Sequence, residues 1–339
     1  MDVGEAVHHL AEGEARRVRP LARLEDLEPL VEAGCALPYV HVRRDALGRL
    51  GADGFGHHGH DNEGRMPYLC AWLQRCVLPF VEGDATGIYR VELHDSYSYL
   101  PTAHMYDNAL VFSRPRHARE SVALLPDPYQ AEGYGGLVSA SAADDIPWSR
   151  KQPTVFFAGT TTGNRDPAKN ERIKACMWSL RHPQDQVFMR ITSVAQMTVE
   201  RCREAVPGFD AVMHPPFSVQ HHFPYRYQLN IAGNTCCWSR VPMVMASGSL
   251  LLHLKTHPDM LWYYPLLREE EHYVGVTSID GTDGGGILSV RARCMSMGDA
   301  WAQEIVGRAH RFVRDYMSRG VASLYAARLF QEAAWLSKP

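Results

Sequence analysis

The sequence lacks a long uninterrupted apolar segment, and this absence limits the classes of protein that it can encode. Its first residues, MDVGEAVHHLAEGEARRVRPL, mix acids, histidines and arginines without an apolar core, unlike a signal peptide or a membrane-spanning helix. An excess of basic charge is also missing, because the formal net charge is −3, so we expect no nucleic-acid partner. We expect a cytoplasmic protein, with peripheral contact at the inner face of the membrane as an open alternative.

The chain has no C-x-x-C pair, although it contains eight cysteines. They are spread along the sequence without the density of a small disulfide-rich domain, and we expect reduced thiols. A length of 339 residues with 45% hydrophobic content is sufficient for a large core and fits two domains better than one.

The most informative segment runs over residues 225–254, YRYQLNIAGNTCCWSRVPMVMASGSLLLHL. Its pattern predicts a strand over residues 225–231, a polar turn, a short helix over residues 239–246, a Ser-Gly-Ser turn and a strand over residues 250–254. A Gly-rich turn and a helix start expose backbone N–H groups, and Arg240 can add a cation, so the unit suits a diphosphate. Ordinary packing in α/β proteins produces the same pattern without a ligand.

A second Gly- and Thr-rich segment, AGTTTGNRDP, follows a predicted buried strand over residues 154–157. Asp166 and Pro167 are typical of a helix start. Backbone N–H groups in this loop, with Arg165 and Arg172 nearby, make it a second candidate cradle for phosphate or another polar ligand.

These motifs resemble one glycosyltransferase family, family 90, which contains the Rumi-type protein O-glucosyltransferases and the capsule-associated xylosyl- and glucosyltransferases. The resemblance covers about residues 87–336 and points to a bacterial lipopolysaccharide- or capsule-type member. It is carried by Tyr-x-Tyr, N-x-x-G-N-T, W-S-R and S-G-S within residues 225–249, by the Gly-Thr-Thr-Thr-Gly loop with Asn170-Glu171-Arg172, and by Tyr264-Pro265 and His272-Tyr273.

The resemblance implies an α/β protein of GT-B type, with two Rossmann-like domains facing across a cleft. Residues 139–153 lack periodicity, and we place the domain boundary there. We therefore predict an acceptor-side domain over residues 1–150, a nucleotide-sugar donor domain over residues 151–318, and a C-terminal helix over residues 319–339 that packs at the domain junction.

By resemblance, the donor-binding residues come from three short segments. They are Gly159, Thr160, Thr161, Thr162, Gly163, Arg165 and Arg172 in the first, Gly233, Asn234, Thr235, Ser239 and Arg240 in the second, and Ser247, Gly248 and Ser249 in the third. The family often has Arg where this chain has Ala158 and Asp where it has Ala232. The three arginines could compensate for these differences.

Asp95 follows a predicted strand over residues 87–93, where open α/β sheets place ligand-handling residues. The resemblance assigns the catalytic base to this position. An inverting transfer needs a carboxylate that takes the proton of the acceptor hydroxyl while that hydroxyl attacks the anomeric carbon. A turn aspartate that caps the next segment is the alternative reading, and Asp107 is a nearby rival.

The resemblance implies an inverting, metal-independent transferase that moves glucose or xylose from a UDP donor to a glycan or lipid-linked glycan in lipopolysaccharide or capsule synthesis. We expect no cofactor. A catalytically weakened nucleotide- or carbohydrate-binding protein is a second hypothesis, suggested by Ala158 and Ala232. A metal-dependent hydrolase built on the histidine-rich segment from His57 to Glu63 is a third, although its spacing fits no closed zinc site.

Overall fold

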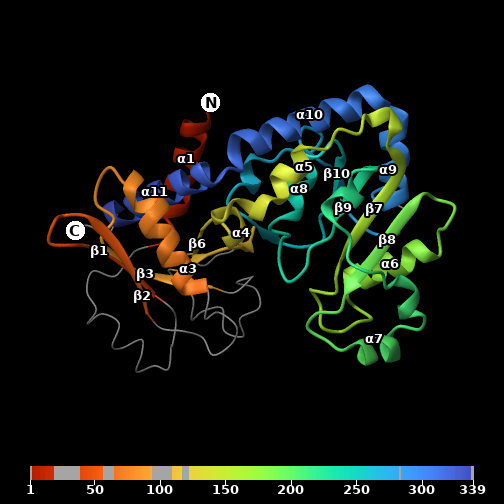
Figure 1. Cartoon of the computed structure of the whole chain (residues 1–339), viewed down its shortest axis with the longest axis horizontal. Coiled ribbons are helices and arrows are strands. Elements are labelled where there is room, and N and C mark those ends of the chain that lie inside the picture. The colour runs from red at the N-terminus through yellow and green to blue at the C-terminus, as the bar shows by residue number, and fades with distance from the viewer. Residues whose placement is uncertain are drawn as a thin grey trace. The chain divides into compact units, whose positions relative to one another are not determined.

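The computed structural model describes residues 2–18, 39–55, 65–93, 109–116, 122–281 and 284–336 (Figure 1). The chain divides into two compact units. Unit 1 comprises Met1–Gly133, Asp259–Tyr264 and Tyr316–Pro339, and unit 2 comprises Tyr134–Pro258 and Pro265–Asp315. The division after Gly133 differs from the boundary predicted at residue 150, because residues 134–150 hold a helix and the acid of a buried ion pair that belong to unit 2.

Unit 2 contains a five-stranded parallel sheet. Its strands are β7 (Gln152–Thr160), β8 (Val187–Ser193), β9 (Tyr225–Asn230), β10 (Leu250–Leu254) and β12 (Val274–Val276). Across the sheet they follow the order β12-β10-β9-β7-β8, and every neighbouring pair is parallel. This is the doubly wound order in which the direction of winding reverses between the first and third strands, here β7 and β9. The prediction of an α/β fold with a parallel sheet is confirmed.

Three helices of unit 2 lie between its strands, as parallel pairing requires: α6 (Glu171–Leu180), α7 (Val199–Ala205) and α8 (Arg240–Ala246). Helix α5 (Leu137–Ala142) precedes β7, and α9 (Ile287–Met297) and α10 (Asp299–Tyr316) follow β12. Short 3₁₀ turns occur at Trp148–Arg150, Phe209–Val212, Val219–His222 and Tyr264–Leu266. Apolar side chains at alternate strand positions, such as Phe157, Leu229 and Leu252, pack against Ile173 of α6 and Val290 of α9.

Unit 1 contains a mixed sheet in the order β2-β1-β3-β4-β6. Its strands are β1 (Tyr39–Arg44), β2 (Leu50–Phe55), β3 (Gly87–Glu92), β4 (Ala109–Val111) and β6 (Val122–Leu124). The β2-β1-β3 pairs are antiparallel, and the β3-β4-β6 pairs are parallel. The turn of the hairpin formed by β1 and β2 uses Gly48 at a φ of 76°, a conformation that glycine adopts readily.

Two helices far apart in the sequence, α1 (Val3–Ala15) and α11 (Arg319–Leu336), pack together in unit 1. Both also bind the end of the sheet: Glu14 of α1 accepts from the backbone N–H of Leu124 at 2.9 Å, and the Tyr325 hydroxyl of α11 donates to the Leu124 carbonyl at 2.8 Å. The remaining elements of unit 1 are α3 (Arg65–Trp72), a π-helical turn (Leu73–Val77), a 3₁₀ turn (Leu78–Phe80), α4 (Pro128–Ala131), β5 (Arg114–Pro115) and β11 (Asp259–Met260). A further 3₁₀ turn, Gly133–Gly136, spans the division between the units.

The predicted C-terminal helix is thus an integral part of unit 1, where alanines such as Ala322 and Ala326 are fully buried. Among the helices that the structure describes, none combines the length and the apolar character needed to cross a bilayer.

Candidate functional site

The carboxyl edge of the unit 2 sheet brings two of the three predicted donor-binding segments together. The β7–α6 loop begins after Thr160, and the β9–α8 turn begins after Asn230. These strands are neighbours in the sheet, and the winding direction reverses between them. In open α/β sheets, ligands bind in the crevice outside the carboxyl ends of the strands at this switch point.

The two loops touch through their glycines. The backbone N–H of Gly163 donates to Asn234 Oδ1 at 2.9 Å, and Gly163 has a φ of 124°, a conformation that glycine adopts readily. A Cβ atom on Gly233 would lie only 2.7 Å from Thr162 Oγ1. The close approach of the two loops therefore depends on the absence of a side chain at Gly233.

Hydrogen bonds to Asn170 and Thr161 fix the shape of the β7–α6 loop. Asn170 caps α6 by accepting from the N–H groups of Arg172 and Ile173, and its Nδ2 donates to the carbonyls of Thr161 at 2.8 Å and Asn164 at 3.0 Å. The Thr161 hydroxyl in turn donates to Ala195 O at 3.0 Å. The loop is consequently held before any ligand arrives.

Arg172 lies between the two loops and is 7% exposed. Its guanidinium donates to Thr162 Oγ1 at 2.6 Å and Thr160 O at 3.2 Å on the β7 side. On the β9 side it donates to Ile231 O and Ala232 O, both at 3.0 Å. The structure therefore places Arg172 as a bridge between the loops.

Arg240, the first residue of α8, brings a second cation to the same edge. One of its Nη atoms donates to the carbonyl of Ala158, and its guanidinium carbon lies 4.7 Å from the centroid of the Phe157 ring. Burial, with a smaller contribution from the neighbouring Arg172 cation, lowers the pKa of Arg240. A Cβ atom on Gly159 would come within 3.2 Å of this guanidinium, so the glycine makes room for it.

The other predicted residues of these two segments occupy less specific positions. Arg165 is exposed in the β7–α6 loop. Thr235 is buried, and Ser239 precedes α8 without capping it by a side-chain hydrogen bond.

The third predicted segment, Ser247 to Ser249, lies at the opposite edge of the sheet. The Ser249 hydroxyl donates at 2.7 Å to the carbonyl of Tyr225, which begins β9. In a strand-helix-strand unit with parallel strands, the helix carries the chain back along the sheet, so its two turns lie at opposite edges. Sequence reasoning grouped both turns into one site, and the structure separates them.

A buried ion pair occupies that opposite edge. The Lys151 ammonium contacts Asp144 and also donates to the Phe223 carbonyl, and both charged side chains are at most 1% exposed. Asp144 Oδ2 accepts from the N–H of Gly248 at 3.0 Å. This group, Asp144 with Lys151 and Gly248, went unnoticed in the sequence, where Asp144 reads as one of two acids in an unpatterned segment.

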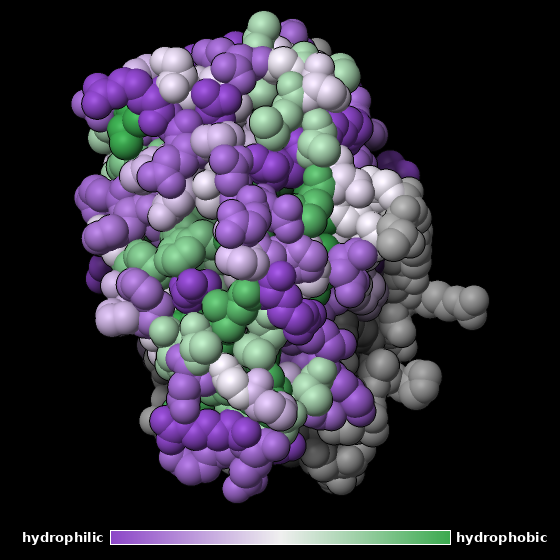
Figure 2. Space-filling model, turned by 90° about the vertical axis from the view of Figure 1, so that its right-hand side faces the viewer, coloured by the Kyte–Doolittle hydropathy of each residue, from purple (hydrophilic) through white to green (hydrophobic). Residues whose placement is uncertain are grey.

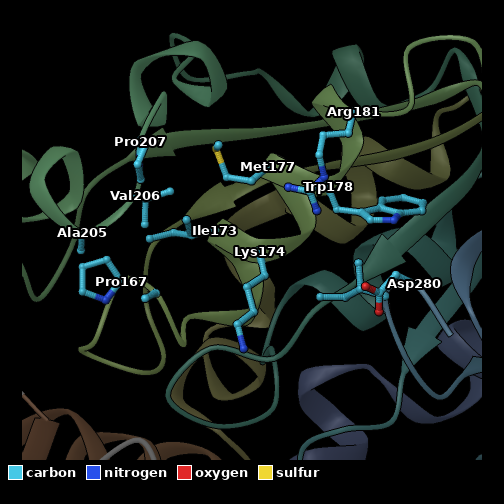
Figure 3. Close-up of a pocket in the computed structure, with 12 residues that line it drawn as sticks. Pro167, Ile173, Lys174, Met177, Trp178, Arg181, Ala205, Val206, Pro207 and Asp280 are labelled. Atoms are coloured by element: carbon cyan, nitrogen blue, oxygen red, sulfur yellow. The ribbon is translucent and has the colours of Figure 1, made fainter.

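A shallow groove of about 560 Å³ runs along the outer side of α6 (Figure 3). Lys174, Met177 and Trp178 of α6 line it together with Arg181, which follows that helix, and they face Val206 and other residues that follow α7. Hydrophobic residues are scattered in small areas between hydrophilic ones on the face seen in Figure 2. We assign the groove no ligand.

Several candidate residues lie outside the described part of the chain. They are the predicted base Asp95, its rival Asp107, and the segment from His57 to Glu63. Among the described residues, no three His, Cys, Asp or Glu side chains gather in a way that could hold a metal ion.

Comparison with known proteins identifies the family of the chain. The family model described as glycosyl transferase family 90 matches residues 137–338, more than half of the chain. No curated protein matches the chain significantly. A solved structure, the 1.35 Å crystal structure of the C-terminal domain of a glycosyl transferase group 1 family protein, LpcC, from Francisella tularensis, is 12% identical. The similarity covers 50% of this chain and 89% of that one with a TM-score of 0.30, too low to carry an argument about the fold.

Proposed function

The chain belongs to glycosyl transferase family 90, and from this premise we propose that it transfers a sugar from a nucleoside diphosphate donor, bound at the carboxyl edge of unit 2, to a glycan acceptor. Glycosyl transfer is the activity class of the family. The donor, the acceptor and the residues that act on them are our proposal.

One observation carries the placement of the donor. At the switch point, Arg172 and Arg240 hydrogen-bond to backbone carbonyls, and no described carboxylate forms an ion pair with either. Poorly solvated cations without an anionic partner are costly, and a bound diphosphate would supply that partner. Backbone N–H groups of the two loops can share the rest of its charge.

We propose UDP-glucose or UDP-xylose as the donor and an inverting reaction at its anomeric carbon. The acceptor hydroxyl forms the new bond to this carbon from the face opposite the diphosphate, the bond to the diphosphate oxygen breaks, and UDP leaves with the electron pair. Asp95 takes the hydroxyl proton as general base. Arginine and backbone donors stabilise the leaving diphosphate without a metal ion.

The proposal extends to the organisation of the whole chain. In a GT-B arrangement, unit 2 would be the donor domain and unit 1 the acceptor domain, with a cleft between them. The acceptor would be a glycan or lipid-linked glycan in lipopolysaccharide or capsule synthesis, at the inner face of the membrane.

Thermal unfolding with a panel of nucleotides and nucleotide sugars, each with and without EDTA, tests the donor. Binding to the folded state at 100 times Kd raises its stability by about 2.7 kcal/mol, which a thermal shift readily detects. We expect a shift with UDP and a UDP-sugar that EDTA does not change. No shift with any nucleotide would contradict the donor site, and a shift that requires metal would contradict the metal-independent mechanism.

Asp95→Asn tests the reaction. Loss of a general base should lower turnover by about 10²- to 10⁴-fold while the donor still binds. A wild-type protein that binds the donor but never transfers its sugar would favour the alternative that Ala158 and Ala232 suggest, a weakened binding protein of the same family.

A further inference from the structure

We propose that Arg172 is a positioning residue: it fixes the spacing between the β7–α6 loop and the β9–α8 turn, so that the paired loops fit a diphosphate better than a monophosphate. This inference rests on the proposed donor site. It differs from the sequence prediction, which made Arg172 a direct contact of the ligand.

The hydrogen bonds of Arg172 already engage all three of its guanidinium nitrogens. Nε donates to Ala232 O at 3.0 Å, and Nη2 donates to Ile231 O at 3.0 Å and to Cys237 Sγ at 3.1 Å. Nη1 donates to Thr162 Oγ1 and Thr160 O. A guanidinium has five N–H donors in a fixed fork, and here both branches of the fork face protein acceptors.

The arrangement of these acceptors explains the spacing. Thr160 ends β7 and Thr162 lies in the loop that follows it, whereas Ile231, Ala232 and Cys237 lie in the turn after β9. The rigid, planar guanidinium therefore sets how far apart the loops lie, and Asn170 anchors the backbone of Arg172 at the start of α6. Lysine keeps the charge, but its donors all radiate from one nitrogen atom and cannot reach both sets of acceptors.

The close packing of the loops makes this spacing sensitive. Gly233 lies so near the other loop that an added Cβ would sit 2.9 Å from Arg172 Nη2. Two phosphate groups span more of such a paired site than one. A change in the spacing of the loops should therefore weaken the binding of a diphosphate, which needs both loops, more than the binding of a monophosphate, which can use one.

The experiment compares Arg172→Lys with Arg181→Lys, which makes the same chemical change at an exposed position next to the same helix. We would measure Kd for UDP and for UMP by calorimetry. Arg172→Lys should raise the Kd for UDP by about tenfold or more and the Kd for UMP by less than about threefold. Arg181→Lys should change neither Kd. A role limited to overall stability would lower Tm and leave the ratio of the two Kd values unchanged, which would overturn the proposal.

Hydrogen exchange of the ligand-free proteins tests the bridge without any nucleotide. In Arg172→Lys, amides of residues 160–165 and 231–239 should exchange faster than in the wild type, because both loops lose a shared anchor. Unchanged exchange in both loops would overturn the proposal. If the wild type binds no nucleotide, the donor site of the proposed function is contradicted, and exchange still shows separately whether Arg172 joins the loops.

Thr162→Val provides a second variant if Arg172→Lys does not fold. It removes one acceptor of Arg172 and leaves the buried carbonyls of Ile231 and Ala232 bonded. Exchange should then rise in residues 160–165 and much less in residues 231–239. Equal exchange in the variant and the wild type would count against the bridge.

Discussion

The two turns that flank α8 resemble each other in sequence and differ in their electrostatics. The turn before α8 holds Gly233 and Asn234, and the turn after it holds Gly248 between two serines. Near the first, Arg172 and Arg240 have backbone carbonyls and a hydroxyl as acceptors, and no described carboxylate pairs with them. Near the second, Lys151 forms an ion pair with the carboxylate of Asp144.

The comparison teaches that a polar, glycine-rich turn is not evidence of an anion site by itself. Both turns present backbone N–H groups and approach a basic side chain closely. At the amino edge, an internal carboxylate already accepts from the backbone N–H of Gly248 and balances the cation. At the carboxyl edge, no described carboxylate balances the positive charges of Arg172 and Arg240, as the proposed donor site requires.

The largest effect should come from removing the ion pair at the amino edge of the unit 2 sheet. Asp144→Ala leaves the buried Lys151 ammonium without its counter-ion, which should lower the free energy of unfolding by about 3–5 kcal/mol. Urea unfolding measures this loss. Asp145→Ala, at the exposed neighbouring position, should change stability by less than about 0.5 kcal/mol. A small effect at Asp144 would mean that the two edges do not differ as described.

A buried carboxylate that forms an ion pair with no described cation extends the contrast to unit 1. Asp127 caps α4 by accepting from the N–H of Gln130 at 3.1 Å, and burial raises its pKa to about 7 despite that hydrogen bond. Because the folded-state pKa lies above the unfolded value, the stability contribution of Asp127 is full below about pH 4 and is lost as pH rises through 7.

Asp127→Asn should therefore unfold at a similar denaturant concentration to the wild type at pH 4 and be more stable by roughly 2–4 kcal/mol at pH 8, since asparagine caps a helix equally well. Urea titrations at the two pH values measure the difference. If the stability difference between Asp127→Asn and the wild type does not grow with pH, burial does not raise the pKa of Asp127 as described.

Arg240→Ala tests the unbalanced edge directly. Removing this cation should weaken UDP binding about 10- to 100-fold, because a hydrogen bond to a charged group contributes about 1.5–3 kcal/mol. Arg150→Ala removes the same charge from an exposed position near the amino edge and should leave Kd unchanged. Equal losses in both variants would reduce the effect to general electrostatics, and unchanged affinity in Arg240→Ala would remove Arg240 from the site.

The smallest effects should come from a matched pair of glycine substitutions. Gly233→Ala places a Cβ 2.7 Å from Thr162 Oγ1, so the loops must separate, and we expect about 1–3 kcal/mol of destabilisation with weaker UDP binding. Gly248→Ala places a Cβ 3.2 Å from Lys151 Cε and should cost less than about 1 kcal/mol without affecting binding. Urea unfolding and calorimetry of both variants measure the losses of stability and of UDP affinity. Larger losses in Gly248→Ala than in Gly233→Ala would contradict the contrast between the two edges.

The sequence predicts the elements around the site well, because each boundary has a local cause. The strand expected over residues 250–254 coincides with β10, and the helix expected over residues 239–246 begins one residue early relative to α8. Buried apolar runs and the turn residues between them are enough to locate these elements.

Contacts between distant residues could not be predicted in this way. Gly163 meets Asn234 across 71 residues of sequence, and only the order of the strands brings β7 beside β9. The sequence shows that Arg172 is charged, but it does not show which carbonyls accept its hydrogen bonds, because every residue carries a carbonyl group. The opposite locations of the two turns of α8 were deducible from the strand-helix-strand pattern and were missed.

Unit 1 is assembled from chain segments that lie before and after unit 2 in the sequence, and this affects how the protein folds during translation. Helix α1 precedes unit 2 in the sequence and is synthesised before it, whereas its packing partner α11 follows unit 2 and is synthesised after it. Unit 2, by contrast, has all five strands of its sheet once Val276 has emerged. Domains usually fold from the N-terminus as they are synthesised, whereas here the second unit completes its sheet while the first still awaits α11.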